Sequence, residues 1–270
     1  MKNAPKSALI TGANRGIGAA FAGALPATTD LLLSARNEAD LKDVADHLEL
    51  PGRSIEAFPA DLSQPAAVEQ LTAEAEARNV DLLILNAGVG HFGAFLDRDF
   101  QDHQAVLDVN IRAVMSLAHS LLPGMIARAK ANKRRAGIII MGSTAGFVPV
   151  PQLAAYAASK AFILSFSEAL AAELARQPVD VLCVCPGAVK TEFADAAGYG
   201  GSTIPGAQSP ATIASDALSA LGRRRTLILD PAANAALKPV ALARAALAEA
   251  IKHGISALKL RDRAKRRSRR

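Results

Sequence analysis

The sequence contains no tryptophan, only two cysteines and only 4% aromatic residues. So few cysteines exclude the disulfide framework that stabilises many small secreted domains. Cys183 and Cys185 are two positions apart in an apolar run, so both side chains should point to one face of a strand, without the geometry of a favourable bridge. We expect both to be core residues. The sequence also lacks a His, Cys and acidic cluster at metal-site spacing, so we expect no catalytic metal.

No segment has the pattern of a signal peptide or of a membrane span. Residues 1–6 lead directly into an apolar run, and no uninterrupted apolar run is long enough to cross a bilayer. We therefore expect a protein of the reducing cytoplasm. With 270 residues, of which 50% are hydrophobic and 21% charged, the chain is long enough to bury a full core.

Apolar runs alternate with amphipathic stretches along most of the chain. This alternation predicts an α/β fold in which helices cover a parallel sheet. Strands are expected near residues 8–11, 31–35, 54–59, 82–86, 137–143, 179–185 and 226–229. No change in composition marks a second domain before residue 230, so we assign 1–230 to one domain, 231–260 to a C-terminal helical extension and 261–270 to a basic disordered tail.

Tyr156, Lys160 and Ser143 outline a site for proton transfer. A phenol has a pKa of about 10, and a nearby positive charge is needed to make it an acid or base near neutral pH. On a helix, Lys160 lies one turn from Tyr156 on the same face and can supply that charge. Ser143 follows a buried strand, at the edge where open α/β sheets bind ligands. By itself, this spacing also fits a surface helix pair and a loop hydroxyl.

A glycine-rich turn near the N-terminus gives a second, independent signal. It follows the apolar run at residues 8–10 and leads into a helix. Gly12 permits the tight turn, Gly16 lets the backbone approach a pyrophosphate, and Gly18 allows the helix to pack against the sheet. The helix N-terminus then faces the phosphates. Alone, such a turn can be a simple strand-to-helix connection.

The chain resembles the short-chain dehydrogenase/reductase family over roughly residues 6–230. The motifs that carry the resemblance stand in the order of the family: Thr11 and Gly12 with Gly16, Ile17 and Gly18; Asp61 and Leu62; Asn86, Ala87 and Gly88; Asn110; Ser143; Tyr156 and Lys160; and Pro186 and Gly187 with Thr191. The resemblance implies a Rossmann-type, doubly wound parallel sheet of about seven strands with helices on both faces.

The resemblance also implies a role for each of these residues. Tyr156 would exchange the proton, Lys160 would lower its pKa and hold the nicotinamide ribose, Ser143 would hydrogen-bond the substrate oxygen, and Asn110 would anchor a water in a proton relay. Asp61 would contact the adenine, Asn86 would brace the sheet, and Val189 and Thr191 would hold the carboxamide. The full cofactor set is Gly12, Asn14, Arg15, Gly16, Ile17, Gly18, Arg36, Asp61, Leu62, Asn86, Ala87, Gly88, Tyr156, Lys160, Pro186, Gly187, Val189 and Thr191.

Charge near the second strand favours NADP(H) over NAD(H). An NAD site has a carboxylate about 20 residues past the glycine turn, which binds the ribose 2′-hydroxyl. Here the second strand ends in Arg36, and Asp30 lies at its other end. Arg36 and Arg15 could clamp a 2′-phosphate, because guanidinium groups bind phosphate bidentately. The alternative is a pair of solvated arginines.

The substrate side is less defined by the sequence. Apolar segments that should surround the nicotinamide include Phe92, Phe95, residues 147–153, Phe193 and Tyr199. They fit an apolar carbonyl compound or alcohol, although several could equally be core residues. We interpret His91 as an incidental polar group. Residues 194–208, rich in Gly and Ala, could form a mobile lid.

The C-terminus departs from the commonest family pattern, because a helical stretch follows the last strand. Tetramer formation is therefore in doubt, and the family resemblance favours a dimer through the helices that carry Asn110 and Tyr156. Residues 252–270 carry a net charge of +8, compared with +6 for the whole chain. This basic end is interpreted as a solvated tail, with weak contact to an anionic membrane surface as the alternative and no specific nucleic acid expected.

Two classes of function remain open from the sequence. The first is an NADP(H)-dependent oxidoreductase that interconverts a carbonyl and an alcohol on an apolar small molecule. The second is a catalytically silent nucleotide-binding sensor or scaffold that acts through its basic tail. Asn110, Ser143, Tyr156 and Lys160 together favour the enzyme, since a pure binder has no need of a tuned phenol.

Overall fold

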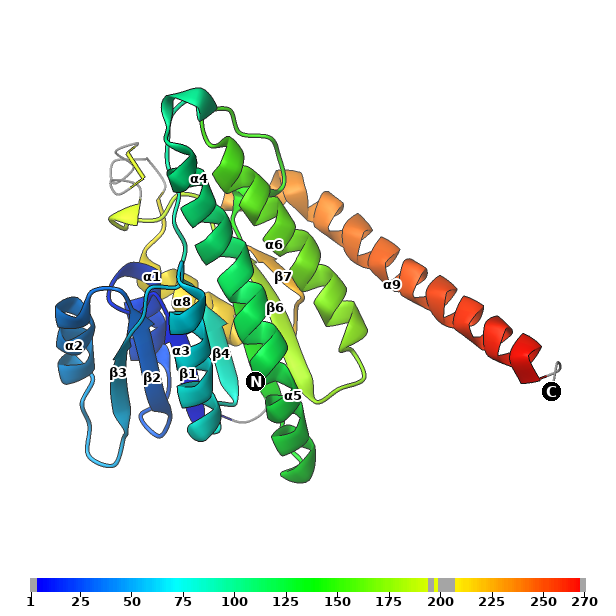
Figure 1. Cartoon of the computed structure of the whole chain (residues 1–270), viewed down its shortest axis with the longest axis horizontal. Coiled ribbons are helices and arrows are strands. Elements are labelled where there is room, and N and C mark those ends of the chain that lie inside the picture. The colour runs from blue at the N-terminus through cyan, green and yellow to red at the C-terminus, as the bar shows by residue number, and fades with distance from the viewer. Residues whose placement is uncertain (1–3, 194–196, 199–206, 268–270) are drawn as a thin grey trace.

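A seven-stranded parallel sheet forms the centre of the molecule. The computed structural model describes residues 4–193, 197–198 and 207–267, with backbone alone at 245, 249 and 252–267. The strands are β1 (Ser7–Thr11), β2 (Asp30–Ala35), β3 (Ile55–Pro59), β4 (Leu82–Leu85), β5 (Ala136–Met141), β6 (Val179–Cys185) and β7 (Thr226–Ile228). They pair in the order β3-β2-β1-β4-β5-β6-β7, as Figure 1 shows. The predicted Rossmann-type sheet of about seven strands is confirmed.

Helices cover both faces of this sheet. On one face lie α1 (Gly16–Ala24), α2 (Glu38–His47) and α8 (Pro210–Ala220). On the other lie α3 (Pro65–Ala77), α5 (Ala113–Ala131) and α6 (Ala154–Glu173), with α4 (Phe100–Leu107) packed beside α6. Because both faces are covered, the strands read as nearly continuous apolar runs rather than as alternating ones.

Alternate strand residues supply two separate cores. Leu9, Leu83 and Ile138 pack with α3, α5 and α6. Their immediate neighbours point the other way, and Ile10 and Ile84 pack with α1 and α8. This alternation fixes the register of the strands, since a shift by one residue would exchange the two cores. The carboxyl ends of the strands are held in fixed relative positions as a result.

The predicted strand at residues 137–143 ends earlier than expected, at Met141. Gly142 N–H still donates to Val184 O at 2.7 Å, but Ser143 then caps the short 3-10 turn η3 (Thr144–Gly146). The Ser143 Oγ accepts a hydrogen bond from Ala145 N–H at 3.1 Å. A serine side chain competes in this way for local backbone donors, which explains why it leaves the strand.

The last helix, α9 (Pro231–Arg267), is longer than predicted. We placed its end near residue 260 and a disordered tail at 261–270, whereas the helix continues to Arg267, with residues 268–270 outside the described part of the chain. Lysine and arginine are good helix formers, and positive charge suits a helix C-terminus. Figure 1 shows α9 leaving the sheet alongside α6 and projecting away from it.

Two contacts fix the start of α9 on the domain. Asp230 Oδ1 accepts a hydrogen bond from Ala233 N–H at 2.7 Å, and Pro231 occupies the first helical position, an N-terminal pattern well suited to a helix. Further along, Arg244 Nε donates to Glu168 Oε2 on α6 at 2.9 Å, and Arg244 Nη2 donates to Ser165 Oγ at 2.8 Å. The extension therefore packs on α6 through a defined interface.

One continuous helical stretch, Phe100–Ala131, is long and apolar enough to cross a membrane by length and composition. It contains α4, a π-helical turn η2 (Asp108–Arg112) and α5. Its most apolar part packs in the core, where Leu117, Leu121 and Met125 are buried against the sheet. The helix thus serves as a core helix of the domain. Cys183 and Cys185 are buried and free, as expected from the sequence.

Candidate active site

The candidate site lies at the carboxyl edge of the sheet, where β1 and β4 are neighbours. The chain crosses from β1 toward β2 and β3 on one side, and from β4 toward β5, β6 and β7 on the other. Such a change of direction leaves a crevice beyond the strand ends, and this is where open α/β sheets bind ligands. The residues that follow β1, β4, β5 and β6 therefore converge there.

The glycine turn after β1 has the conformation that a dinucleotide fingerprint requires. Gly12 and Gly16 have φ angles of +66° and +56°, values that favour glycine. A Cβ on Gly12 would lie 2.9 Å from Asn86 Nδ2 and 3.0 Å from Ala87 Cα. One on Gly18 would collide with the Gly12 carbonyl. The turn is therefore packed tightly against the end of β4.

Asn86 joins the ends of β1 and β4. Its Nδ2 donates to Thr11 O at 3.0 Å and to Gly12 O at 3.1 Å, and its backbone N–H donates to Thr11 Oγ1 at 3.0 Å. These bonds hold the glycine turn in place, as the bracing role expected of Asn86 requires.

The N-terminus of α1 can receive a negatively charged group. Arg15 is its N-cap residue and provides no side-chain cap, so no side chain satisfies the first backbone N–H groups of the helix. Those groups and the helix dipole together favour a phosphate. A tight glycine turn that leads into an uncapped helix N-terminus fits the pyrophosphate of a dinucleotide cofactor.

Tyr156 and Lys160 lie in the first two turns of α6, on the same face. The Lys160 ammonium is 5.6 Å from the centroid of the Tyr156 ring. Lys160 Nζ donates to Met141 O, the last residue of β5, at 2.9 Å, which fixes the amine at the end of the sheet. The predicted proximity of the two side chains is present, and its cause is the helical spacing together with this anchor.

Lys160 is buried, with a relative exposure of 5%. Burial lowers the pKa of Lys160 from 10.5 to about 8. The pKa of Cys185 is raised well above its usual value, first by the hydrogen bond with Cys183 and then by burial. The Cys185 thiol is therefore uncharged at neutral pH, and the lysine has no carboxylate partner among the interactions described for it.

Asn110 lies in the π-helical turn η2 between α4 and α5. Such turns occur frequently at functional sites. The Asn110 amide donates from Nδ2 to Val89 O and Ser159 Oγ at 2.9 and 3.0 Å, and its Oδ1 accepts from Val89 N–H at 2.9 Å. The side chain thus holds the segment after β4 against α6. This engagement makes Asn110 a positioning residue, while the predicted water relay stays a prediction.

Glycines bring the segment after β4 close to the two catalytic candidates. A Cβ on Gly88 would lie 3.3 Å from Asn110 Oδ1 and 3.5 Å from Lys160 Nζ. A Cβ on Gly90 would lie 2.8 Å from Tyr156 Cδ2 and 3.2 Å from Phe193 Cζ. The Tyr156 ring is therefore confined between this backbone and the Phe193 ring, whose centroid is 5.6 Å away.

The two arginines expected to clamp a 2′-phosphate lie on the surface, and one of them is engaged. Arg15 forms an ion pair with Glu192, and both side chains are largely exposed. Arg36 follows directly after β2 and is exposed. Asn14 Nδ2 donates to Asp40 Oδ2 at 3.2 Å, which links the glycine turn to the first turn of α2.

The remaining predicted cofactor residues lie on the same edge with different surroundings. Asp61 is exposed, and its Oδ1 accepts from Ser63 N–H at 3.0 Å, whereas Leu62 is buried in the core. A Cβ on Gly16 would lie 3.1 Å from Thr191 Cγ2, so the turn after β1 and the segment after β6 are in contact. Gly187 packs against Asp230, the cap of α9, where a Cβ would lie 2.8 Å from the Asp230 Cβ.

Comparison with known proteins shows the family of the chain. Residues 6–199 match the description of the short chain dehydrogenase family. The chain belongs to the short-chain dehydrogenase family. Oxidoreductase UcpA of Salmonella typhimurium is 36% identical over 194 residues, covering 70% of this chain and 72% of the relative.

Solved short-chain dehydrogenase structures show the same fold. A short-chain dehydrogenase from Sphingobium yanoikuyae in complex with NADPH is 29% identical, with a TM-score of 0.75 over 93% of this chain and 95% of that one. A short-chain dehydrogenase/reductase from Burkholderia phymatum in complex with NAD is 26% identical, with a TM-score of 0.77 over 89% and 93% of the two chains. This short-chain dehydrogenase is thus an oxidoreductase of a fold that binds nicotinamide cofactors.

The substrate side of this short-chain dehydrogenase is only partly described. Phe92 and Phe95 are exposed after β4, and Phe193 contacts Tyr156. Tyr199 and most of the proposed lid at residues 194–208 lie outside the described residues. His91 lines a small cavity beside Tyr156, together with Gln152 and His103. Across the described parts of the chain, no group of His, Cys, Asp and Glu could hold a metal ion.

Several site residues were not singled out by the sequence analysis. Gly90 confines Tyr156, Ser159 accepts from Asn110, and Glu192 pairs with Arg15. The position of Ser159, next to Lys160 and on the Tyr-x-x-x-Lys motif, is a sequence signal for its role. The contacts of Gly90 and Glu192 depend on how separate loops meet, for which the sequence holds no local signal.

Proposed function

We propose that this chain is an NADP(H)-dependent oxidoreductase that interconverts a carbonyl and an alcohol on an apolar small molecule. The observation that carries the proposal is the placement of Tyr156 beside the buried Lys160 ammonium, at the edge of the sheet that bears the glycine turn. A buried cation next to a phenol lowers the free energy of the phenolate, so it makes the hydroxyl a usable acid near neutral pH.

Each residue of the chain has a distinct task in this scheme. Tyr156 gives its hydroxyl proton to the substrate oxygen in reduction and takes it back in oxidation. Lys160 stabilises the phenolate that is left, and Ser143 holds the substrate oxygen. Asn110 positions the backbone of Val89 and, through Ser159, the first turns of α6. The nicotinamide ring of the bound cofactor supplies or accepts the hydride.

NADP(H) is the proposed cofactor because positive charge surrounds the expected 2′-phosphate position. Arg36 follows β2 directly, where an NAD site would carry a carboxylate, and Arg15 lies in the glycine turn. Arg15 also pairs with Glu192, so a phosphate would have to compete with that carboxylate. We expect Arg36→Asp to shift preference from NADPH toward NADH. Unchanged discrimination between the two nucleotides in steady-state kinetics would contradict this part of the proposal.

The substrate, the oligomer and the membrane contact that we propose are those expected from the sequence. The substrate is apolar, because the described residues around Tyr156 include Phe193 and the exposed Phe92 and Phe95. A cytoplasmic homodimer is proposed, with the surface of α5 and α6 as the contact. Weak attachment to an anionic membrane is proposed for the basic end of α9, since clustered Lys and Arg contribute about 1 kcal/mol each at such surfaces.

A panel of apolar ketones and aldehydes tests the catalytic proposal directly. We expect NADPH consumption with at least one class, and a fall of about 10²- to 10⁴-fold in kcat/KM for Tyr156→Phe with NADPH affinity retained. NADPH fluorescence titration and a thermal melt serve as controls for binding and folding. Tight NADPH binding without turnover across the panel would favour the sensor or scaffold instead.

A further inference from the structure

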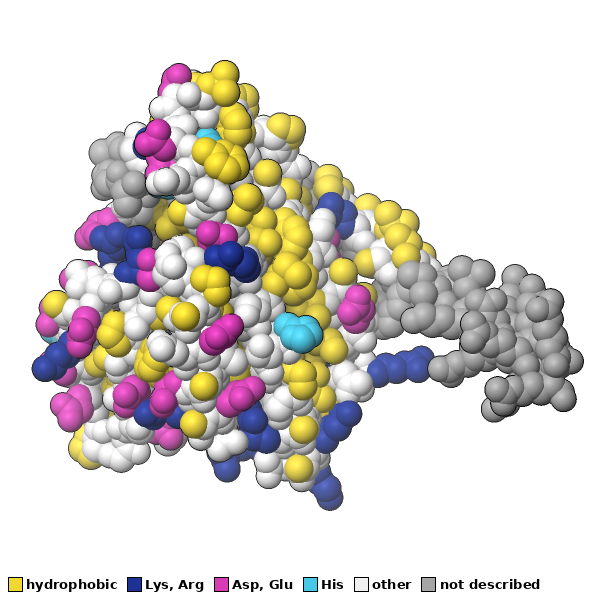
Figure 2. All heavy atoms as spheres, viewed as in Figure 1, with side chains coloured by type: hydrophobic (Ala, Val, Ile, Leu, Met, Phe, Trp, Pro, Cys, Tyr) yellow, Lys and Arg dark blue, Asp and Glu magenta, His cyan; other side chains and the backbone are white. Residues whose placement is uncertain are grey.

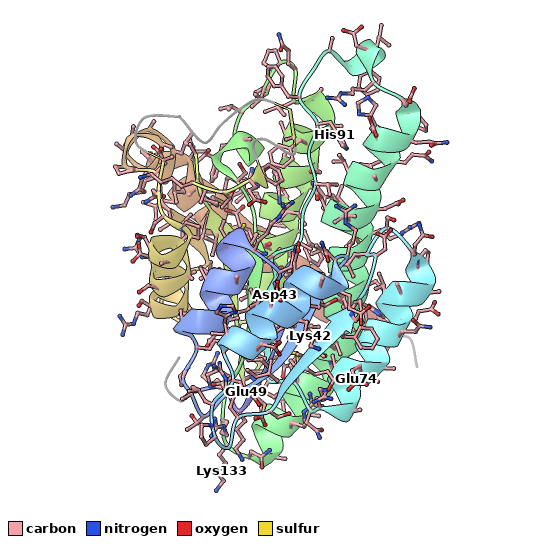
Figure 3. The ribbon with its side chains drawn as sticks, turned by 90° about the vertical axis from the view of Figure 1, so that its left-hand side faces the viewer. Lys42, Asp43, Glu49, Glu74, His91 and Lys133 are labelled. Atoms are coloured by element: carbon pink, nitrogen blue, oxygen red, sulfur yellow. The ribbon has the colours of Figure 1, made fainter. Side chains whose placement is uncertain are left out.

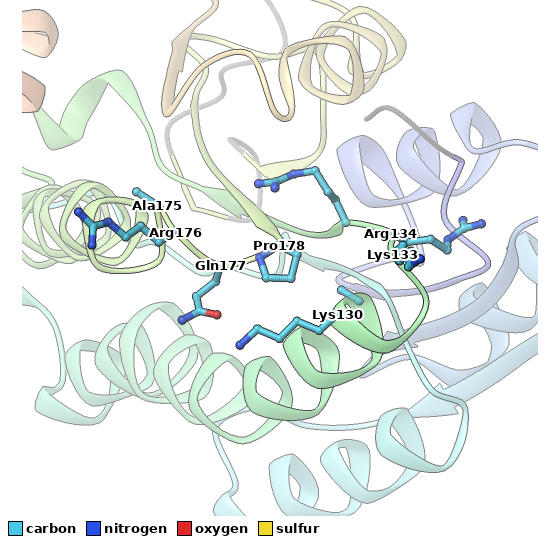
Figure 4. Close-up of a pocket in the computed structure, with 9 residues that line it drawn as sticks. Lys130, Lys133, Arg134, Ala175, Arg176, Gln177 and Pro178 are labelled. Carbon is cyan, nitrogen blue, oxygen red and sulfur yellow. The ribbon is translucent and has the colours of Figure 1, made fainter.

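We propose that this chain has a second ligand site, at the amino-terminal edge of its sheet, for an anion that carries several phosphate groups. The site, here called the basic groove, lies between the α5–β5 and α6–β6 connections. It is lined by Ala129, Lys130, Lys133, Arg134, Arg135, Ala175, Arg176, Gln177 and Pro178. Figure 4 shows these side chains around the hollow, which has a volume of about 420 Å³.

The basic groove contains more positive charge than its surroundings neutralise. Its five cationic side chains come from two connections that are about 40 residues apart in the sequence. The described ion pairs bring one carboxylate to them, that of Asp180, which binds Arg135. The C-terminal ends of α5 and α6 add about half a negative charge each. A net charge of about +3 thus remains in a concave site.

Two of the five cations, Arg135 and Arg134, are held in place by hydrogen bonds and line the edge of the basic groove. Arg135 Nη2 donates to Asp180 Oδ1 at 2.6 Å and to Val179 O at 3.1 Å, and this pairing raises the pKa of Arg135. Arg134 Nη2 donates to Ala4 O. Because these guanidinium groups are held in place, the positive edge of the groove does not depend on mobile side chains.

The other three cations have no partner in the described residues. Lys130, Lys133 and Arg176 form no ion pair or side-chain hydrogen bond among residues 4–193, 197–198 and 207–267. In Figure 4, Lys130 extends from the end of α5, while Arg176 comes from the opposite wall. Two ammonium groups and a guanidinium thus line the hollow without a described ion pair.

The backbone at Lys133 determines where its side chain leaves the end of α5. Lys133 has a φ angle of +52°, in the left-handed region, directly after the C-cap of α5. Glycine or asparagine is the usual residue at this position of a helix end, and a lysine there is less favourable by roughly 1 kcal/mol. Asn79 has the same conformation directly after the C-cap of α3, so this is a common way for a helix to end. The turn directs its side chain to the rim of the groove.

The chemistry of the groove fits phosphate groups. Guanidinium groups bind phosphate with two parallel hydrogen bonds, and ammonium groups bind it as point charges. A volume of about 420 Å³ lies in the range of small-molecule sites, so it can hold a chain of two or three phosphates. These phosphates can belong to a free polyphosphate-type molecule or to a phosphorylated lipid headgroup, and the experiment separates the two sources.

The basic groove is distinct from the candidate active site. It lies where β5 and β6 begin, whereas Tyr156, Ser143 and the glycine turn lie where strands end. Figure 3 shows this separation, with His91, which lines the cavity beside Tyr156, and Lys133 at opposite ends of the molecule. Ligand binding in the groove therefore does not depend on the proposed reaction or on its cofactor.

Binding of inorganic tripolyphosphate to the full chain tests the proposal. We expect isothermal titration calorimetry at about 0.1 M salt to show saturable binding. The triple variant Lys130→Gln/Lys133→Asn/Arg176→Gln should bind at least about 10-fold more weakly, and asparagine is chosen at 133 because it tolerates the left-handed backbone. The variant Lys42→Gln/Lys190→Gln/Lys238→Gln removes the same charge from exposed positions elsewhere and should bind as the parent does.

Further arms identify the source of the phosphates. Vesicles of phosphatidylcholine with 5% phosphatidylinositol bisphosphate should sediment the parent and not the triple variant if the ligand is a headgroup, and tripolyphosphate should bind without vesicle attachment if it is free. Either result supports the site. Equal binding by the triple variant and its charge-matched control overturns the proposal, as does the absence of binding to both probes. Binding of duplex DNA that tripolyphosphate fails to displace also overturns it. If the triple variant does not fold, the single variant Arg176→Gln replaces it in these experiments, and a thermal melt checks that this variant is folded.

Discussion

Single residues determine where the Tyr156 ring lies. The hydroxyl needs a fixed position relative to the substrate oxygen, and the ring is confined by the Gly90 backbone on one side and by Phe193 on another. We predict that Gly90→Ala lowers kcat by about 10²-fold, because a Cβ 2.8 Å from Tyr156 Cδ2 displaces the ring. Steady-state kinetics would measure the loss.

A matched glycine in a helix gives the control for this substitution. A Cβ on Gly23, in α1, would meet only Leu48 Cδ2 at an ordinary distance of 3.8 Å. Gly23→Ala should leave kcat unchanged and raise the free energy of unfolding by about 0.5–1 kcal/mol, since alanine is the better helix former. Equal activity of the Gly90 and Gly23 variants would show that the contact with Tyr156 has no catalytic consequence.

The buried Lys160 predicts a pH dependence of both activity and stability. Burial lowers its pKa to about 8, so the cation that assists Tyr156 is lost as the pH rises through about 8. We expect kcat/KM for carbonyl reduction to fall over that range. Between about pH 8 and 10.5 the unfolded chain holds the Lys160 proton and the folded chain does not, so Lys160 makes the free energy of unfolding rise with pH.

Two measurements check this prediction. A pH profile of kcat/KM tests the activity, and denaturant unfolding at several pH values tests the stability against Lys160→Met, which removes the titrating group. The difference in unfolding free energy between the parent and Lys160→Met should change with pH in this window. A flat profile of both quantities would show that Lys160 does not titrate there.

At the scale of secondary structure elements, an ion pair between Arg244 and the buried Glu168 helps to hold α9 on α6. The Glu168 side chain is 6% exposed and that of Arg244 is 36% exposed. Among the described partners of Glu168, Arg244→Met would leave its carboxylate with Thr226 Oγ1 alone, at 3.3 Å. We predict a loss of about 2 kcal/mol in the free energy of unfolding, because the change leaves a buried charge without its partner.

Hydrogen exchange locates the effect of this change. Amide hydrogens near the start of α9 should exchange faster in Arg244→Met than in the parent protein. Exchange of the amide hydrogens of β1 and β4 should change only by the amount that follows from the lower global stability. The double variant Glu168→Gln/Arg244→Met should recover part of the loss, since it removes the unpaired charge as well. Unchanged protection of α9 would mean that other contacts with α6 hold the helix.

The sequence predicted elements better than their ends and contacts. The spacing of Tyr156 and Lys160 was sufficient to place them on one helix face, because that geometry is local. The end of β5 was predicted two residues too late, since nothing local shows that Ser143 would cap its own turn. The π-helical turn that carries Asn110 was also not predicted, and the hydrogen bonds of Asn110 to Val89 depend on how two separate segments meet.

At the scale of the whole molecule, an apolar strip on α5 and α6 supports the proposed homodimer. Met115 and Phe162 are 42% and 37% exposed, and Figure 2 shows hydrophobic side chains along this face. We predict that Phe162→Glu converts a dimer into a monomer in light scattering, because a carboxylate in an apolar interface is desolvated without a partner. Leu242→Glu on α9, where Leu242 is 62% exposed, should leave the dimer intact. A monomeric parent protein at micromolar concentration would refute the assembly.

The distribution of charge could not be predicted at this scale. In the sequence, the excess of positive charge lies in residues 252–270, and the rest of the chain carries a net charge of about −2. The fold nevertheless brings Lys130, Lys133 and Arg176 into one groove. Net charge gives the number of charged residues but not their positions in the fold. It therefore cannot reveal a basic groove on a domain whose net charge is slightly negative.

The contact between the glycine turn after β1 and the segment after β6 has a consequence for synthesis on the ribosome. Gly16 touches Thr191, and Arg15 pairs with Glu192. A nascent chain that has released only its first three sheet strands therefore has the glycine turn but no partner for it. Both contacts can form only after residues 191 and 192 have been synthesised, so a truncated product that ends before this segment would carry the glycine turn without them.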